Sequence, residues 1–415
     1  MVSAGRSGFA YYVKLSLAGR LFSNRGWPEA VGGIILGLVN ILYLILANKP
    51  FSIYTGFLNW GQHIYSALGL DGLVGAPKAS PLAERTSVGD IGLLLGALLA
   101  ALAAGEFKLK RIGKEGYVDA VAGGLLMALG VVLAFGCNWG GFFSAITALS
   151  LHGYAMMVGL IFGGYLGLKY VNWRSARLFE KALKELELEA EAPAASAGNP
   201  GADANPGRAR SPVALPAALI LAAAAVAATW AVGGSRFAAL MMLGVLVGVT
   251  LQRSRFCFAT AFRDLLGGAE QARAARLQVG IALGIAVGAT GAAALKYMGF
   301  IDPAVYVKPV GPLNIVGGIL FGFGMSIAGG CASGSLWKAA EGNTGLMAAL
   351  ATAVLSYPLF KALLGPSIKR LANPGVFLPD VMGWAGALAF VYLSMLGWIL
   401  FSLYMAYQRR VDPWG

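Results

Sequence analysis

The amino-acid sequence predicts an all-α polytopic membrane protein built from two inverted-topology repeats, with about ten transmembrane helices plus re-entrant half-helices. Three observations support this fold class. The 415 residues are 58% hydrophobic and only 12% charged, whereas soluble domains are about a quarter charged. A glycine-rich apolar segment that ends in cysteine occurs twice, and lysine and arginine gather in alternate loops. A soluble amphipathic solenoid is disfavoured because long stretches have no polar face.

Ten apolar segments approach the roughly 20 residues that a helix needs to cross the hydrocarbon core of a bilayer. We expect them at 28–47, 88–105, 117–136, 153–172, 213–233, 237–252, 277–298, 313–330, 345–364 and 382–406. Further apolar pieces are too short to cross and too apolar to be ordinary loops, which predicts re-entrant segments. They lie at 51–69, 138–150, 256–267 and 332–341.

Charged and flexible stretches divide the chain into five parts. Residues 1–27 are basic and have no small-residue cleavage site, so we expect a retained, cytoplasmic N-terminal arm. Residues 28–173 form the first transmembrane repeat. The cytoplasmic linker 174–212 begins as a charged helix and continues in Ala, Pro, Gly and Asn, a composition typical of flexible connections. The second, inverted repeat spans 213–406, and a cytoplasmic tail follows at 407–415.

The basic residues set the orientation, because Lys and Arg are enriched in short cytoplasmic loops. With the N-terminus inside, most of them fall on the cytoplasmic side. The outer loops hold scattered charges: Lys49, Lys78, Arg85, Lys308, Lys369 and Arg370. Gln252, Arg253 and Arg255 are interpreted as cytoplasmic anchors. The net charge of +13 therefore reflects inner loops beside anionic lipid and does not indicate a nucleic-acid partner.

The repeated segment is the most informative pattern in the sequence. Residues 123–137 match residues 317–331 without a gap at four glycines and the final cysteine. Span 117–136 runs outward and span 313–330 runs inward, so the two copies are antiparallel. Residues 51–57 and 256–262 form a weaker second echo, with Ser52 in the position of Cys257. Inverted repeats are typical of transporters whose substrate path lies between the two halves.

The three cysteines, Cys137, Cys257 and Cys331, all sit at the mouths of short apolar segments. Taken singly, a membrane cysteine is most often a small buried apolar residue. A helix that breaks at membrane depth, however, presents the positive end of the next helix to the gap, where an anion is favoured. A soft thiol at each break points to a solute that itself carries sulfur or selenium. Gly136 and Gly330 precede two of these cysteines, and close helix packing explains them as well as a site does.

Other polar residues are weaker candidates. Asn138 is interpreted as a helix cap or, less favoured, as a substrate contact. His152 is interpreted as a loop or interface histidine, with gating as the alternative. Arg263 with Asp264, and Lys338 with Glu341, suggest ion pairs or gates near the cytoplasmic boundary. Proton coupling needs a titratable group near mid-membrane, and no strong candidate stands out. No metal or cofactor is expected, since no Cys-x-x-Cys pair occurs.

Three ordered blocks resemble the YeeE/YedE family of prokaryotic membrane proteins. They are residues 135–152 (from Phe-Gly-Cys-Asn to Ser-Leu-His), residues 255–264 (Arg-Phe-Cys-Phe to Arg-Asp) and residues 329–342 (Gly-Gly-Cys to Glu-Gly). The resemblance is closest to the YedE branch of selenium transporters. A sister branch imports thiosulfate along a cysteine path. The resemblance implies that Cys137, Cys257 and Cys331 line such a path in the inner (plasma) membrane. Ser52 departs from the thiosulfate branch, which has a cysteine in its first-half opening.

Three functions remain open on these grounds. The favoured one is a permease, rather than an enzyme, for a small selenium- or sulfur-containing species such as thiosulfate. A thiol oxidoreductase would need two sulfurs close enough to bond. A non-transporting scaffold would dock a cytoplasmic sulfur- or selenium-handling protein on the linker and the basic inner loops. No nucleotide-binding loop appears, so ATP would have to act through another chain.

Overall fold

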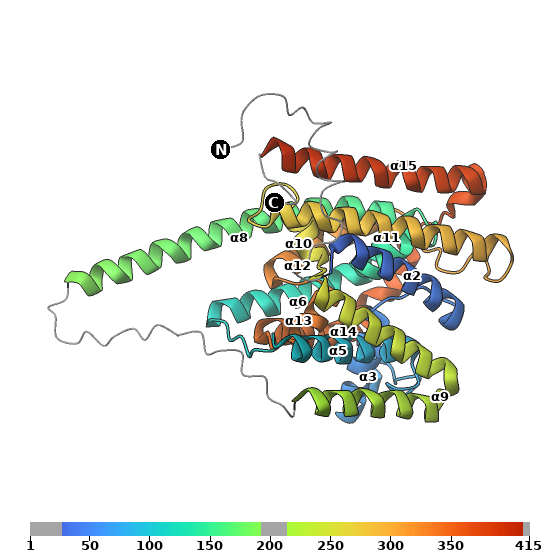
Figure 1. Ribbon diagram of the computed structural model, residues 1–415, viewed down its shortest axis with the longest axis horizontal. Coiled ribbons are helices and arrows are strands. Elements are labelled where there is room, and N and C mark those ends of the chain that lie inside the picture. Colours follow the sequence, from blue (N-terminus) through green and yellow to red (C-terminus); the bar gives the residue numbers. More distant parts are fainter. Residues whose placement is uncertain (1–26, 192–213, 410–415) are drawn as a thin grey trace.

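The structure, a computed structural model, describes residues 27–191 and 214–409, with side chains omitted for 185–191. Every named element in these ranges is helical, which confirms the all-α prediction. The elements are α2 Glu29–Ala47, α3 Tyr54–Ala67, α4 Asp71–Val74, α5 Arg85–Ala104, α6 Lys114–Ala134, η1 Asn138–Phe143, α7 Ser144–Thr147, α8 His152–Glu191, α9 Ala214–Arg253, α10 Phe258–Arg263, α11 Gln271–Tyr297, α12 Pro312–Ala328, α13 Ala332–Ala340, α14 Thr344–Leu371 and α15 Leu378–Gln408 (Figure 1).

Within the described ranges, nine helices are long and apolar enough to cross a membrane, which confirms a polytopic membrane protein. Each of the ten predicted spans falls on one of them. The predicted spans 213–233 and 237–252 both fall on α9. The predicted N-terminal arm 1–27 lies almost wholly outside the described residues, as does most of the tail 407–415.

α9 contains a sharp break that divides its 40 residues into two arms (Figure 1). A straight helix of that length would span about 60 Å, twice the roughly 30 Å hydrocarbon core. The backbone leaves helical geometry at Gly233 and Gly234, and Gly234 has a φ of 69° that glycine adopts without strain. The sequence-based expectation of two separate spans is therefore compatible with this element.

The four predicted re-entrant pieces all form short helices: α3, η1 with α7, α10 and α13. Their large aromatic side chains pack together in the interior instead of facing outward. Trp139 lies 4.8 Å from Phe51 and 6.0 Å from Phe258 between ring centroids. All three rings are fully buried. The middle of the protein is thus a core of short helices enclosed by long ones.

Glycines bring the long helices into backbone contact. A Cβ on Gly123 of α6 would lie 2.5 Å from the Gly324 carbonyl of α12, and one on Gly130 would lie 2.6 Å from the Gly317 carbonyl. The earlier glycine of α6 meets the later glycine of α12, so these two helices run in opposite directions. Small residues permit such close approach between membrane helices.

The long helices pair in a regular way across the two halves of the chain. α5 packs along α9, and α11 packs along α2. α12 packs along α8, and α14 packs along α6. The charged stretch that opens the predicted linker at residue 174 is helical, as expected, and continues α8 without interruption to Glu191, so that α8 projects beyond its neighbours (Figure 1). The rest of the linker, 192–213, lies outside the described residues.

Candidate functional site

Cys137 caps the half-helix that follows α6. The break begins at Phe135, whose φ of 58° lies in the left-handed region, and helical geometry resumes at Asn138. The Cys137 sulfur accepts a hydrogen bond from the backbone amide of Gly140 at 3.4 Å. Ser, Thr, Asp and Asn are the usual residues at this position. The N-terminal amides of the half-helix are therefore gathered around a buried thiol.

Cys331 has the same role at the second break. α12 ends at Gly329, with a φ of 78°, and α13 begins directly after Cys331. The Cys331 sulfur accepts a hydrogen bond from the Gly334 amide at 3.3 Å and lies 3.4 Å from the Ser333 hydroxyl. Both cysteines of the repeated segment thus stand at the N-terminus of a buried half-helix.

Asn138 is not the helix cap that we predicted. The cap is the preceding residue, Cys137, because the chain re-enters helical geometry one residue earlier than expected. The Asn138 side chain is fully buried, and neither amide atom has a hydrogen-bond partner among the described protein atoms. An unpaired buried amide is costly, so a role of Asn138 in substrate contact stays a prediction.

Gly136 and Gly330 lie where the chain leaves the long helix. A Cβ on Gly136 would lie 2.6 Å from the Gly141 amide nitrogen, and one on Gly330 would lie 2.8 Å from the Leu346 side chain. Position 136 needs glycine because the close atoms belong to the backbone, whereas the Leu346 side chain could shift to accept a Cβ at position 330. Gly136 also lines the cavity beside Cys137 that is described below.

Cys257 and Cys331 are direct neighbours. Both are buried, and neither forms a disulfide. Both sulfurs lie over the open side of Gly334, at 3.1 Å and 3.2 Å from the position that a Cβ would take. The other half-helix has an equivalent arrangement, because the open side of Gly140 faces Ser52. A serine and a thiol therefore stand at one break, and two thiols stand at the other.

Tyr54 lies between the two breaks. Its hydroxyl is within electrostatic range of both Cys137 and Cys331. The residue is buried, and the hydroxyl has no hydrogen-bond partner among the described protein atoms. A phenol without a partner is able to donate a hydrogen bond to an anion.

A cavity of about 90 Å³ opens beside Cys137. Its walls combine cations, hydroxyls and the two helix ends at the break. The lining residues are Lys49, Ser52, Tyr54, Thr55, Val131, Phe135, Gly136, Cys137, Gly140, Tyr306, Lys308 and Tyr357. A second cavity of about 450 Å³ shares Thr55 with it and contains Lys78 and Lys361. Together the two cavities are lined by four lysines, so the surroundings of Cys137 are positively charged.

Lys308 is the central cation of the smaller cavity. Its ammonium donates to the Phe135 carbonyl at 2.7 Å and lies 4.3 Å from the ring centroid of Tyr306. Burial, together with the charges of Lys49 and Lys361, lowers the pKa of Lys308 to about 8. Burial also raises the pKa of Tyr306, whose hydroxyl is hydrogen-bonded to Ser52. At neutral pH the cavity therefore offers a lysine cation beside neutral phenols, a combination suited to an anion.

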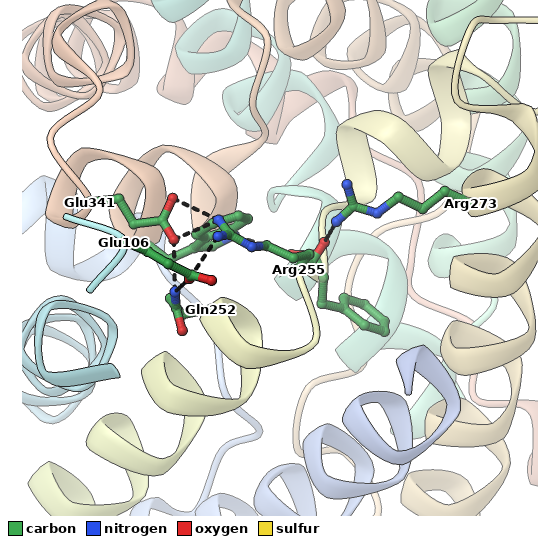
Figure 2. A network of polar contacts seen from close by, with 7 residues as sticks. Glu106, Gln252, Arg255, Arg273 and Glu341 are labelled. Atoms are coloured by element: carbon green, nitrogen blue, oxygen red, sulfur yellow. Dashed lines mark hydrogen bonds and ion pairs between the residues drawn. The ribbon is translucent and has the colours of Figure 1, made fainter. Parts of the chain in front are cut away.

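A charged network surrounds Arg255, two residues before Cys257 (Figure 2). Arg255 donates to both carboxylate oxygens of Glu341, at 2.6 Å and 2.9 Å, and to Glu106 at 2.7 Å. Gln252 donates to the same two carboxylates, and Arg273 donates to the Arg255 carbonyl. The network joins the ends of α5, α9 and α13 to the segment that carries Cys257.

One sequence-based interpretation is wrong at this network. Arg255 and Gln252 bind the carboxylates of Glu341 and Glu106, and their role as cytoplasmic anchors stays a prediction. Lys338 does not pair with Glu341. Its ammonium turns back to the Gly329 carbonyl at 3.0 Å, at the break before Cys331. A guanidinium reaches two carboxylates at once, which an ammonium does less well.

Arg263 and Asp264 form the expected ion pair, with contacts at 2.6 Å and 3.0 Å, at the end of α10. His152 is not the loop or interface residue that we expected. It is fully buried at the start of α8, where Nδ1 lies 2.7 Å from the Ser150 hydroxyl and Nε2 has no described partner. The gating roles of these residues stay predictions.

Sequence reasoning missed most of the outer cavity. Lys49 and Lys308 counted only as scattered outer charges, and Tyr54, Tyr306 and Tyr357 were not considered. The alternation of Tyr306 and Lys308 just before the second glycine-rich helix is the signal that could have drawn attention to that loop. In the described part of the chain, no cluster of three or more His, Cys, Asp or Glu side chains could hold a metal ion.

Comparison with known proteins identifies the family of the chain. The sequence profile of the family described as "Sulphur transport" matches residues 9–166 and 253–414. The chain belongs to this family. The two matched regions contain the cysteines of both breaks and leave out the whole of the linker 174–212.

Named relatives of this sulphur-transport chain are transporters, not enzymes. "Probable transporter YedE" of Salmonella typhimurium is 28% identical over 346 residues, which cover 80% of this chain and 81% of the relative. "Thiosulfate transporter TsuA" of Escherichia coli is 34% identical over 113 residues, and that of Spirochaeta thermophila is 36% identical over 105. These two matches cover 27% and 25% of this chain and 30% of each relative. No solved structure matches the chain significantly.

Proposed function

We propose that the protein is a permease for a small sulfur- or selenium-containing anion in a prokaryotic inner (plasma) membrane, with both termini cytoplasmic. The anion enters the outer cavity beside Cys137, passes Tyr54, reaches Cys331 and Cys257, and leaves through the Arg255 network. One observation carries the proposal: three buried thiols from distant parts of the chain belong to one core, and the first of them lines a lysine-containing cavity.

The chemistry of the thiols supports a soft anion. A protonated thiol is a weak donor, so it holds an anion without binding it tightly. A sulfur or selenium atom is polarizable and matches the thiol better than a hard oxyanion does. Rapid passage needs several weak sites in succession, not one strong site. Cys137, Cys331 and Cys257, with Asn138 and Tyr54 beside them, provide such a succession.

The helix pairing supports an inverted repeat. The exchange of the two halves sets α2 against the second arm of α9, α5 against α11, α6 against α12 and α8 against α14. It turns the α5–α9 pairing into the α2–α11 pairing, and the α8–α12 pairing into the α6–α14 pairing. All four pairings occur. The antiparallel crossing of α6 and α12 lies at the centre of this exchange. Alternating access in such transporters moves one half against the other around a site at their interface.

The identity of the anion rests on the relatives and on one residue. TsuA relatives are named for thiosulfate, and the YedE relative carries no substrate in its name. Ser52 stands where the other half has Cys257, which leaves the outer break with one thiol. We propose thiosulfate, which exposes a terminal sulfur, and selenite, whose charge lies on oxygens around a selenium atom, as the two substrates to compare.

A cytoplasmic protein that handles sulfur or selenium is the proposed receiver of the anion. The basic inner loops and the charged extension of α8, from residue 174 to Glu191, would offer it a surface. A receiver that consumes the anion would keep its free concentration low inside and so favour inward movement.

The test is uptake of labelled thiosulfate and labelled selenite into liposomes that contain the purified protein. Cys137→Ser and Cys331→Ser should each lower the initial rate about tenfold or more, because serine keeps the shape but not the soft sulfur. Ser402→Ala is the matched control, since this buried hydroxyl on α15 bonds only within its own helix.

The outcomes separate the candidate functions. No uptake of either anion by the wild-type protein would favour the scaffold, which moves nothing by itself. Uptake that is unchanged in both cysteine variants would contradict the thiol path while keeping the permease. A rate for one anion far above the other identifies the preferred substrate.

A further inference from the structure

Asp90 is a buried acid that the proposed path does not use. It lies near the outer end of α5, inside the predicted span 88–105. Its side chain is 0% exposed, and neither carboxylate oxygen has a hydrogen-bond partner among the described protein atoms. An acid in this position is costly to keep, particularly when ionised, and such residues in transmembrane segments mark function.

The carboxylate rests against the helix that forms the cavity wall. A Cβ on Gly56 of α3 would lie 2.1 Å from Oδ2 of Asp90, so only glycine leaves room for the acid. The two residues before Gly56, Tyr54 and Thr55, line the outer cavity. A change of charge at Asp90 therefore acts directly on the segment of α3 that meets the substrate.

The surroundings of Asp90 do not neutralise it. Its electrostatic neighbours are Glu84, Cys137, Lys49 and Tyr43. The nearby cation, Lys49, instead donates to Glu84 at 3.3 Å and to Thr86 at 2.7 Å. The other helices packed on α5 carry these titratable or charged groups: Tyr54, His63 and Tyr65 on α3, Lys338 on α13, and Arg236 and Arg253 on α9. Residues 237–252 of α9 carry none.

Packing alone does not require an acid at this position. Gly244 of α9 packs on the carbonyl of Gly89, the residue before Asp90 on α5. In the corresponding pair of helices, Gly33 of α2 packs on the carbonyl of Gly280, the residue before Ile281 on α11. Isoleucine thus occupies the matching position of α11. The fold accepts an apolar side chain there, so the acid on α5 calls for a reason other than stability.

We propose that Asp90 is a proton-binding site that couples proton entry to anion uptake. The inference rests on the permease function proposed above. On the outer side, one carboxylate oxygen takes a proton from water and becomes a neutral acid, which α3 then packs against. On the inner side, the O–H bond breaks and the proton returns to water, leaving the carboxylate.

Coupling to protons would help an anion to enter the cell against the membrane potential. The membrane potential of a cell that is negative inside opposes the entry of an anion in proportion to its charge. Each proton that accompanies the anion cancels one of those charges. A bound metal ion is a poorer choice for this role, since no described cluster of three or more acidic, His or Cys side chains surrounds Asp90.

The experiment uses the full-length protein in liposomes with the membrane potential clamped and thiosulfate as the probe. With the outside about one pH unit more acidic than the inside, one coupled proton drives about tenfold accumulation. A trapped pH-sensitive dye reports proton movement that depends on thiosulfate. Asp90→Asn should abolish both signals, because the amide keeps the shape of the acid but binds no proton. Asp380→Asn, at an exposed acid on α15, is the control and should keep both.

Each outcome decides the proposal. Proton movement with thiosulfate in the wild type and its loss in Asp90→Asn support it, provided that the variant keeps the wild-type melting temperature and a thiosulfate flux down its own gradient. Thiosulfate movement without protons in the wild type overturns it and leaves the permease intact, as does pH-driven accumulation that survives in Asp90→Asn. A wild type that moves neither thiosulfate nor selenite removes the permease and this inference together.

Discussion

The thiols of Cys257 and Cys331 both lie over the open face of Gly334, although one cysteine precedes α10 and the other precedes α13. Residues that act as one unit give non-additive losses when they are replaced. We therefore expect the double variant Cys257→Ser/Cys331→Ser to transport no more slowly than the slower of the two single variants. Initial uptake rates of labelled thiosulfate measure this.

Cys137 provides the control for that experiment, because it lies at the other break. Combining Cys137→Ser with Cys257→Ser should multiply the two single losses. If the Cys257–Cys331 pair multiplies in the same way, the two thiols act as independent sites and the paired arrangement has no part in transport.

Lys308 predicts a pH dependence of anion binding. Its pKa of about 8 means that the ammonium is charged below pH 8 and is progressively lost above it. The affinity for thiosulfate should therefore fall as the pH rises from about 7 to 9, and Lys308→Met should weaken binding about tenfold at neutral pH. Equilibrium binding of labelled thiosulfate across this range is the measurement.

The variant Lys308→Arg tests whether loss of the lysine charge causes the pH dependence, because arginine stays protonated in this range. Lys308→Arg should bind with little pH dependence, whereas Lys369→Met, at an exposed lysine on α14, should behave like the wild type. A wild-type affinity that is constant from about pH 7 to 9 would argue against Lys308 as the anion's cation.

The Arg255 network predicts an inner barrier. Arg255→Ala leaves Glu341, whose side chain is 3% exposed, without its guanidinium, which should cost about 2 kcal/mol of stability. The same change should let a membrane-impermeant maleimide reach Cys257 and Cys331 faster from the cytoplasmic side. Labelling rates and the melting temperature in detergent measure the two effects.

Arg253→Ala is the matched control for this variant. Arg253 ends α9 two residues earlier and forms no ion pair in the described part of the chain. It should label at the wild-type rate. Equal labelling in Arg255→Ala and the wild type would show that the network does not close the path.

The crossing of α6 and α12 predicts sensitivity to a single methyl group. A Cβ on Gly317 would lie 2.5 Å from the Ala134 amide nitrogen, so Gly317→Ala should cost about 1–3 kcal/mol and lower the melting temperature. Gly397→Ala on α15 meets nothing within 4 Å and should be neutral or slightly stabilising. Similar melting temperatures for both variants would contradict the close crossing.

Composition and local pattern were enough to predict the helical elements. The ten apolar spans and the four short pieces depend on runs of neighbouring residues, and helix formation in lipid satisfies the backbone within the same segment. The spacing of glycine and cysteine likewise pointed to the two breaks. The cap was misassigned by one residue because propensity favours Asn138 over Cys137, while the break geometry decides which residue precedes the first turn.

The outer cavity and Asp90 were beyond prediction for a common reason. Lys49, Lys308 and Tyr54 belong to separate segments, and nothing in the sequence near Lys308 reveals that Cys137 lies beside it. Asp90 looks like an ordinary residue near the start of a span until α3 is seen to bury it against Gly56.

The sequence by itself determined which segments cross the membrane, where two of them break and that a thiol stands at each break, because these features follow from local hydropathy and backbone conformation. Only the tertiary structure decided that Cys257 joins Cys331, that Arg255 holds Glu341 and that Asp90 lacks a partner. These relationships join helices distant in the sequence, and glycine-mediated backbone contact sets their distances.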